Sequence, residues 1–227
     1  DVPFPYVISP QRDLTLTPIA TTEEGLALKT EYRARTEGGR YRITGSGTVA
    51  DRESGSQPED DVFRGHVDAE GRFNINERFR WGFRANRASD DTYKRVYDFG
   101  DERFLTSKAY VEGFDGDDYL SARTFAFQGQ SQGEPTSELP YVLPELHLNT
   151  TSDRRLYGGR GFLDASMLGI TRTDGRDSQR ISGTLGWRRS IIDRLGGMLE
   201  ATLALNSDVY ASNGLDPGNA NVNPAHP

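Results

Sequence analysis

Apolar and polar residues alternate along much of this chain. The clearest stretch is 63–75, in which every even position is polar or charged and no odd position is. After a turn at Asn76-Glu77 the alternation resumes over 79–86. A period of two places successive side chains on opposite faces of a β-strand, whereas a helix would distribute them around its axis. Both segments are therefore predicted to be strands.

Further stretches repeat the alternation less regularly. They cover 26–35, 41–49, 104–114, 119–128, 141–150, 155–171, 180–190 and 197–210. Short Gly- and Asp-rich turns separate several of them, at 37–39, 115–118 and 174–175, and are typical of β-hairpins. Longer polar connections, near 51–61, 86–102 and 129–139, alternate with these turns, and no segment predicts a helix of more than two turns. We predict an all-β antiparallel fold of roughly ten or eleven strands.

Three features favour an outer-membrane β-barrel over a soluble β-protein. Several strands span about 11–13 residues, closer to the about 9–11 of a tilted membrane strand than to the about 5–6 of a soluble one. The polar positions of 63–75 carry charges of both signs, as a water-filled lumen does, and aromatic residues gather near strand ends in 73–83 and 93–104, as in aromatic girdles. Soluble β-proteins also have solvated charged faces and aromatic cores, so the pattern alone leaves both architectures open.

Composition excludes several function classes. The chain has 227 residues, no Cys and a formal net charge of -7. The lack of Cys excludes a disulfide scaffold, a zinc ribbon and a thiol nucleophile, and the acidic balance argues against a nucleic-acid partner. No apolar run approaches the roughly 18–20 residues of a membrane-spanning helix.

Nothing in the sequence indicates an enzyme, and no metal or cofactor is predicted. The three His residues, His66, His147 and His226, lie far apart, and the usual hydrolase, metalloprotease and phosphate-loop motifs are absent. The Gly-rich run 158–162 is interpreted as close packing or a bend in a strand. Three alternatives remain: a small outer-membrane hydrolase, a soluble glycan-binding β-sandwich, and a passive porin-type channel.

The opening stretch combines strand-like alternation with three prolines, which cannot donate to a β-ladder. The run PYVISPQRDLTLTP over 5–18, followed by GLALKTEYR over 25–33, resembles the start of the barrel of the LptD family, also called Imp or OstA. The segment DTYKRVYDFGDERFLTS over 91–107 resembles a later part of that barrel.

This resemblance implies a β-barrel of the cell outer membrane that transports and assembles lipopolysaccharide and is not an enzyme. It implies four partners: lipopolysaccharide, a plug lipoprotein, LptE, inside the barrel, the periplasmic bridge protein LptA, and outer-membrane lipid. It also implies a lateral gate between the first and last strands. There Pro5 and Pro18 would weaken strand pairing, and Pro10 would lie in the connection between the first two strands.

The resemblance also implies how the chain is organised. We expect residues 1–227 to be a fragment of one outer-membrane β-barrel domain, with an N-terminal jelly-roll and the closing strands outside this sequence. We expect 211–227 to form an external loop or a disordered tail. LptA would be reached through the jelly-roll.

Four arginines are candidate lumen residues: Arg64, Arg72, Arg80 and Arg84. They would stand on the charged face of the predicted strands, where they could contact the glycan or the plug lipoprotein. The competing interpretation is that they are solvated and form ion pairs with Asp68 or Glu70.

Overall fold

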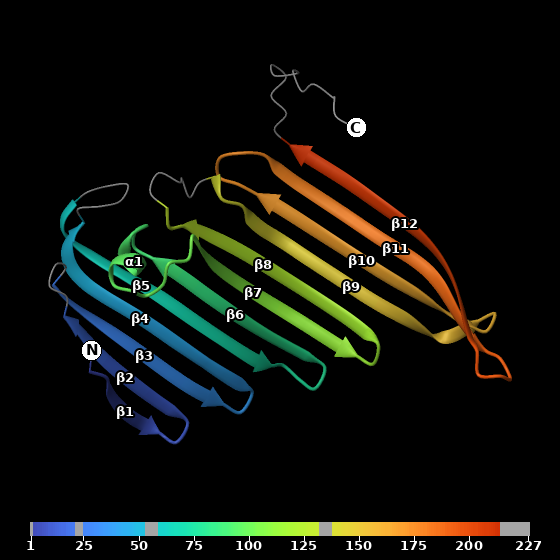
Figure 1. Cartoon of the computed structure of the whole chain (residues 1–227), viewed down its shortest axis with the longest axis horizontal. Helices are drawn as coiled ribbons and strands as arrows, with labels where there is room; N and C mark the ends of the chain where they lie inside the picture. Colours follow the sequence, from blue (N-terminus) through green and yellow to red (C-terminus); the bar gives the residue numbers. More distant parts are fainter. Residues whose placement is uncertain (1, 21–24, 53–58, 132–137, 214–227) are drawn as a thin grey trace, which may run out of the picture.

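The computed structural model describes residues 2–20, 25–52, 59–131 and 138–213. Within these ranges the chain forms twelve strands and one short helix. All twelve strands belong to one antiparallel sheet in which each strand pairs with the next along the chain (Figure 1). The all-β antiparallel prediction is confirmed, with twelve strands instead of ten or eleven. In the described part of the chain, no helix has the length and apolar character needed to cross a membrane.

The twelve strands range from 6 to 16 residues in length. The strands are β1 (Phe4–Ser9), β2 (Arg12–Ala20), β3 (Leu26–Thr36), β4 (Gly39–Arg52), β5 (Glu59–Asn74), β6 (Phe79–Ala88), β7 (Phe104–Asp115), β8 (Asp118–Gly129), β9 (Tyr141–Leu156), β10 (Gly159–Thr171), β11 (Asp177–Ile192) and β12 (Met198–Asn213). The helix α1 (Tyr93–Val96) lies between β6 and β7.

The two ends of the sheet differ in the length of their connections (Figure 1). At one end, called the short-turn end, connections run through 10–11, 37–38, 75–78, 116–117, 157–158 and 193–197. At the other end, called the long-loop end, the longest connections are 89–103 and 130–140. The alternation of short and long connections predicted from the sequence is therefore confirmed.

One predicted strand is divided by a turn. The stretch predicted as a single strand over 155–171 contains the end of β9, a turn at Tyr157-Gly158 and the start of β10. Tyr157 and Gly158 have φ angles of 51° and 81°, and positive φ at both central residues is what a type I′ hairpin turn requires. The single-strand prediction was wrong because a Tyr stands where Asn or Asp usually marks this turn.

Three other predicted boundaries change. Strand β12 continues to Asn213, so 211–213 belong to a strand and not to the predicted loop or tail, while 214–227 lie outside the described residues. Strands β4 and β5 extend into the predicted connection 51–61, of which 53–58 also lie outside the described residues. Strand length was underestimated because polar residues continue the ladder beyond the apolar alternation.

The register keeps the two faces of the sheet distinct. Ile43, Ala69 and Ala85 lie opposite one another on β4, β5 and β6 and share the apolar face. The adjacent row, which includes Asp68 and Asn86, lies on the polar face. A slip of one residue in any pair would exchange the faces, so this phase is maintained by the pairing itself.

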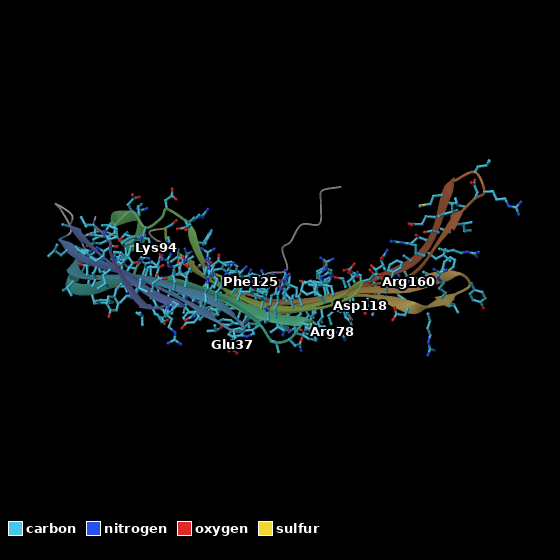
Figure 2. The ribbon with its side chains drawn as sticks, turned by 90° about the horizontal axis from the view of Figure 1, so that it is seen from below. Glu37, Arg78, Lys94, Asp118, Phe125 and Arg160 are labelled. Carbon is cyan, nitrogen blue, oxygen red and sulfur yellow. The ribbon has the colours of Figure 1, made fainter. Side chains whose placement is uncertain are left out.

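The apolar face is uncovered in the described part of the chain. All twelve strands lie in one curved layer (Figure 2), so no second described sheet packs on this face. Phe63 and Leu205 are 72% and 71% exposed. Phe73 and Trp81 stack on the same face with ring centroids 4.6 Å apart, and Trp81 remains 38% exposed. A β-sandwich needs two packed sheets, so the sandwich alternative is contradicted.

Candidate functional site

The first strand is the least extensively paired strand of the described sheet. β1 and β2 share five registered residue pairs, interrupted by a bulge between Val7 and Ser9, whereas β11 and β12 share sixteen. Pro5 lies in this short ladder, opposite Thr15. Proline has no N–H to donate, so Pro5 removes one backbone donor from β1, which lies at the edge of the described sheet.

The other two prolines of the opening stretch lie outside the β1–β2 ladder. Pro10 occupies the connection between β1 and β2, as predicted. Pro18 lies opposite Leu28 of β3, beyond the part of β2, Arg12–Leu16, that β1 covers. Pro5 and Pro18 therefore do not face each other, and Pro18 stands nearer the long-loop end.

The segment between β6 and β7 folds back over the polar face of the sheet. We call residues 89–103, which contain α1, the strap; it stands off one face of the sheet at Lys94 (Figure 2). Tyr93 and Tyr97 of the strap form a buried apolar cluster with Ile19 of β2 and Ala27 of β3. The strap therefore reaches from β6 across to the second and third strands.

A buried ion pair anchors the strap to β5. Arg64 donates from Nε to Asp90 Oδ2 and from Nη2 to Asp90 Oδ1, both at 3.0 Å. Nη2 also donates to Thr92 Oγ1 at 2.9 Å. The two charged side chains are only 2% and 5% exposed. Such a two-pronged guanidinium–carboxylate contact fixes the orientation of both groups as well as their distance.

The Asp90 carboxylate also organises the start of α1. Its Oδ1 atom accepts hydrogen bonds from the backbone N–H groups of Thr92 and Tyr93, at 3.1 and 2.9 Å. Burial by itself would raise the pKa of Asp90, but hydrogen bonds from Arg64, Ser89 and Thr92 outweigh it and lower the pKa to about 2. Asp90 is therefore ionised at neutral pH, and the pair is a true salt bridge.

A hydrogen-bond chain provides a second anchor. Ser46 Oγ of β4 lies 2.7 Å from His66 Nδ1 of β5 and 2.7 Å from the Tyr93 hydroxyl. The Phe99 ring of the strap packs against His66, with ring centroids 4.5 Å apart. Polar bonds thus tie the strap to β4 and β5, while apolar contacts hold it against β2 and β3.

The four predicted lumen arginines do not form one site. Arg64 forms the buried salt bridge with Asp90 that anchors the strap to β5. Arg80 forms an ion pair with Glu112 at 2.7 Å, and Arg84 lies 3.6 Å from Asp68. Arg72 and Arg84 both line a groove of about 680 Å³ at the short-turn end of the polar face.

This groove is strongly basic. Two carboxylates, Asp13 and Glu70, contribute to its wall. Seven cationic side chains line it: Arg33, Arg35, Arg40, Arg42, Arg72, Arg84 and Lys108. Within the described ranges, no group of three or more His, Cys, Asp or Glu residues could hold a metal ion.

Comparison with protein families identifies the relatives of this chain. The model of the family described as LptD, LPS transport system D, matches residues 62–225, which is more than two thirds of the sequence. The chain belongs to the LptD family. This family transports lipopolysaccharide in the outer membrane of Gram-negative bacteria and is not a family of enzymes. A comparison with curated proteins gave no match.

Sequence reasoning did not find the strap anchor. The connection 86–102 was predicted only as a polar loop, and its aromatic residues were assigned to a girdle at a strand end. That assignment was wrong, because Tyr93 and Tyr97 are buried on the polar face. The available signal was the density of aromatic residues in an otherwise polar connection, together with an Asp two residues before Thr92, a pattern typical of local turn hydrogen bonding.

The buried salt bridge predicts that the strap is selectively released by loss of either partner. Removing one member of a buried pair costs about 3–5 kcal/mol, because the other charge is left uncompensated. Arg64→Gln or Asp90→Asn should therefore greatly accelerate amide hydrogen exchange in 89–103. The control is Arg180→Gln, which breaks the exposed Arg180–Asp208 pair (2.8 Å, 47% and 45% exposed) and should cost less than about 1 kcal/mol. Equal exchange of the strap in all three variants would contradict this role.

Protonation of the Asp90 carboxylate sets the pH below which the strap loses the stabilisation from its salt bridge. Its pKa of about 2 lies below the value of about 3.9 for Asp in an unfolded chain. The pair therefore stabilises the strap fully above about pH 4, and this stabilisation is lost as the pH falls toward about 2. A fluorophore on the thiol of an Arg95→Cys variant, the only thiol in the chain, should report constant emission down to about pH 4 and a change below it. The same change in an Asp90→Asn background would contradict the assignment.

Proposed function

We propose that this chain forms part of the wall of an outer-membrane β-barrel through which lipopolysaccharide passes, and that β1 forms one side of a lateral gate. The observation that carries the proposal is the membership of the LptD family. It is supported by the short β1–β2 ladder of five pairs that includes Pro5. Because a seam that opens must have fewer inter-strand hydrogen bonds than its neighbours, the first strand is the natural moving element.

The two faces of the sheet have different roles in this proposal. The apolar face, with exposed side chains such as Phe63 and Leu205, contacts lipid hydrocarbon. The polar face lines the wet passage. Strands such as β5, with 16 residues, exceed the about 9–11 residues that a tilted strand needs to cross the hydrocarbon. Their ends therefore extend beyond the membrane, and the strap covers the polar face there.

The strap supports β1 as the moving strand. Its apolar contacts reach Ile19 of β2 and Ala27 of β3, and among the described residues this cluster includes none of β1. β2 is thus held by its nine registered pairs with β3 and by the strap. Within the described ranges, β1 is held only by its five pairs with β2. Opening at the seam between β1 and the last strand would therefore displace β1 more easily than β2.

Partners follow from the family in the same way. We propose that the plug lipoprotein LptE occupies the polar side of the complete barrel. We further propose that the bridge protein LptA delivers lipopolysaccharide through an N-terminal jelly-roll. In this arrangement the described sheet is one part of a larger barrel domain. Lipopolysaccharide reaches it at the short-turn end, which faces the periplasm.

The gate proposal predicts the effect of restoring the missing backbone donors. Pro5→Ala or Pro18→Ala adds one N–H, and a net hydrogen bond stabilises a folded state by about 0.5–1.5 kcal/mol. The closed state should gain about two- to twelvefold in population, and labelled lipopolysaccharide should reach the cell surface more slowly. Pro10→Ala, in the connection outside both ladders, is the matched control and should leave export unchanged. Unchanged surface lipopolysaccharide and unchanged envelope permeability in both strand variants would contradict the gate.

A further inference from the structure

We propose that Arg35, Arg40 and Arg72 form a binding site for the phosphate and carboxylate groups on the sugars of the transported glycolipid. This inference rests on the proposed function and adds to it the location and chemistry of one contact on the passage. The site lies in the basic groove at the short-turn end of the polar face, which is also lined by Pro10 and Gln11 of the β1–β2 connection.

The three arginines form a row across adjacent strands. Arg35 of β3 lies directly opposite Arg40 of β4, which in turn lies directly opposite Arg72 of β5. Residues directly opposite in antiparallel strands have Cβ atoms about 4.5–5.5 Å apart, and like charges in such pairs are destabilising. All three side chains are exposed, and none forms an ion pair with a described residue. The row therefore holds three closely spaced cations without an anion of their own.

The acidic residues of the groove do not neutralise this row. Asp13 is engaged by Arg33, with Oδ1 2.8 Å from Nε. Glu70 is engaged by Arg42, with Oε1 3.1 Å from Nη2. The groove therefore retains a large excess of positive charge, although the chain as a whole carries a net charge of -7.

A second arginine row on the same face serves as an internal comparison. Arg155, Arg160 and Arg188 also lie directly opposite one another, on β9, β10 and β11 near the short-turn end. Here the sheet supplies the counter-charges. Arg160 lies 3.1 Å from Asp117 and 3.7 Å from Asp153, and Arg188 lies 3.5 Å from Glu200. Among the described residues, the sheet thus supplies counter-charges to two of the three arginines of this row and to none of the other row, which stays open to a ligand.

The chemistry of the open row selects its ligand. A guanidinium group binds phosphate or carboxylate through two parallel N–H donors. Three guanidinium groups in a row match a ligand with several anionic groups better than a single small anion. The groove volume of about 680 Å³ lies in the range that accommodates an organic ligand of several rings. A phosphorylated or carboxylated oligosaccharide satisfies both conditions, whereas an acyl chain would gain nothing from the charges.

The test compares the two arginine rows in the full-length protein reconstituted in lipid nanodiscs. The probes are lipopolysaccharide with a phosphorylated core and the same lipopolysaccharide after enzymatic dephosphorylation. Arg35→Gln, Arg40→Gln and Arg72→Gln combined should weaken binding of the phosphorylated form by about tenfold or more, and dephosphorylation should remove most of this difference. The matched control combines Arg155→Gln, Arg160→Gln and Arg188→Gln and should change affinity by less than about twofold. Single Arg40→Gln, at the centre of the row, should weaken binding by about threefold, and it keeps the test available if the triple variant does not fold.

Further measurements identify the source of the anionic group. Inorganic phosphate, or nanodiscs containing phosphatidylglycerol, should not compete with lipopolysaccharide at the row. If inorganic phosphate or phosphatidylglycerol, at the concentration found in the cell, displaced lipopolysaccharide from the row, the assignment to an anion on a sugar would be overturned. Equal lipopolysaccharide affinity in the two triple variants would also overturn it. So would a triple variant of the open row that binds lipopolysaccharide normally and loses only the binding of an acidic protein. Failure of the proposed function would look different, because the parent protein would then neither bind nor export lipopolysaccharide.

Discussion

Each strand of this sheet must keep its apolar side chains in phase with those of both neighbours. Because side chains alternate with a period of two, a slip of one residue in any pair would bring charged groups to the apolar face. The observed register keeps this phase over most of the described sheet, and register shifts interrupt it locally in four of the ladders. It thereby creates one broad apolar face that no described sheet covers and one polar face that carries many charges. This apolar face is compatible with the hydrocarbon surroundings that the proposed function requires.

The polar face is organised at both of its ends. At the long-loop end, the Arg64–Asp90 salt bridge and the cluster around Tyr93 hold the strap against β2, β3, β4 and β5. At the short-turn end, a basic groove lies beside the connection between β1 and β2. β1 itself has few partners. The arrangement thus combines a firmly held polar face with one short-paired strand, which is compatible with the proposed lateral gate.

The sequence alone was sufficient to predict those features of the fold that depend on the local pattern of residues. Alternation located most of the strands, and Gly- and Asp-rich turns located the connections 37–38, 116–117 and 172–176, whereas the turn at Tyr157-Gly158 carried no usual signal. The site was less accessible to prediction because its contacts join residues distant in sequence. Arg64 and Asp90 are separated by 26 positions, so a charged strand residue and a loop carboxylate could not be paired in advance. Arg72 was recognised as a polar-face residue, but only the register reveals that it lies opposite Arg40.

The central claim, that one face of the sheet meets hydrocarbon and the other meets water, can be tested directly along β5. Single cysteines introduced at successive positions from 67 to 74 of the full-length protein in bilayers, beyond the part of β5 that the strap covers, would carry spin labels. Their collision rates with oxygen, which concentrates in lipid, and with a water-soluble nickel complex would then be measured. The account predicts alternation with a period of two, with high oxygen collision at odd positions and high nickel collision at even positions. Equal access of the nickel complex to both sets of positions would contradict it.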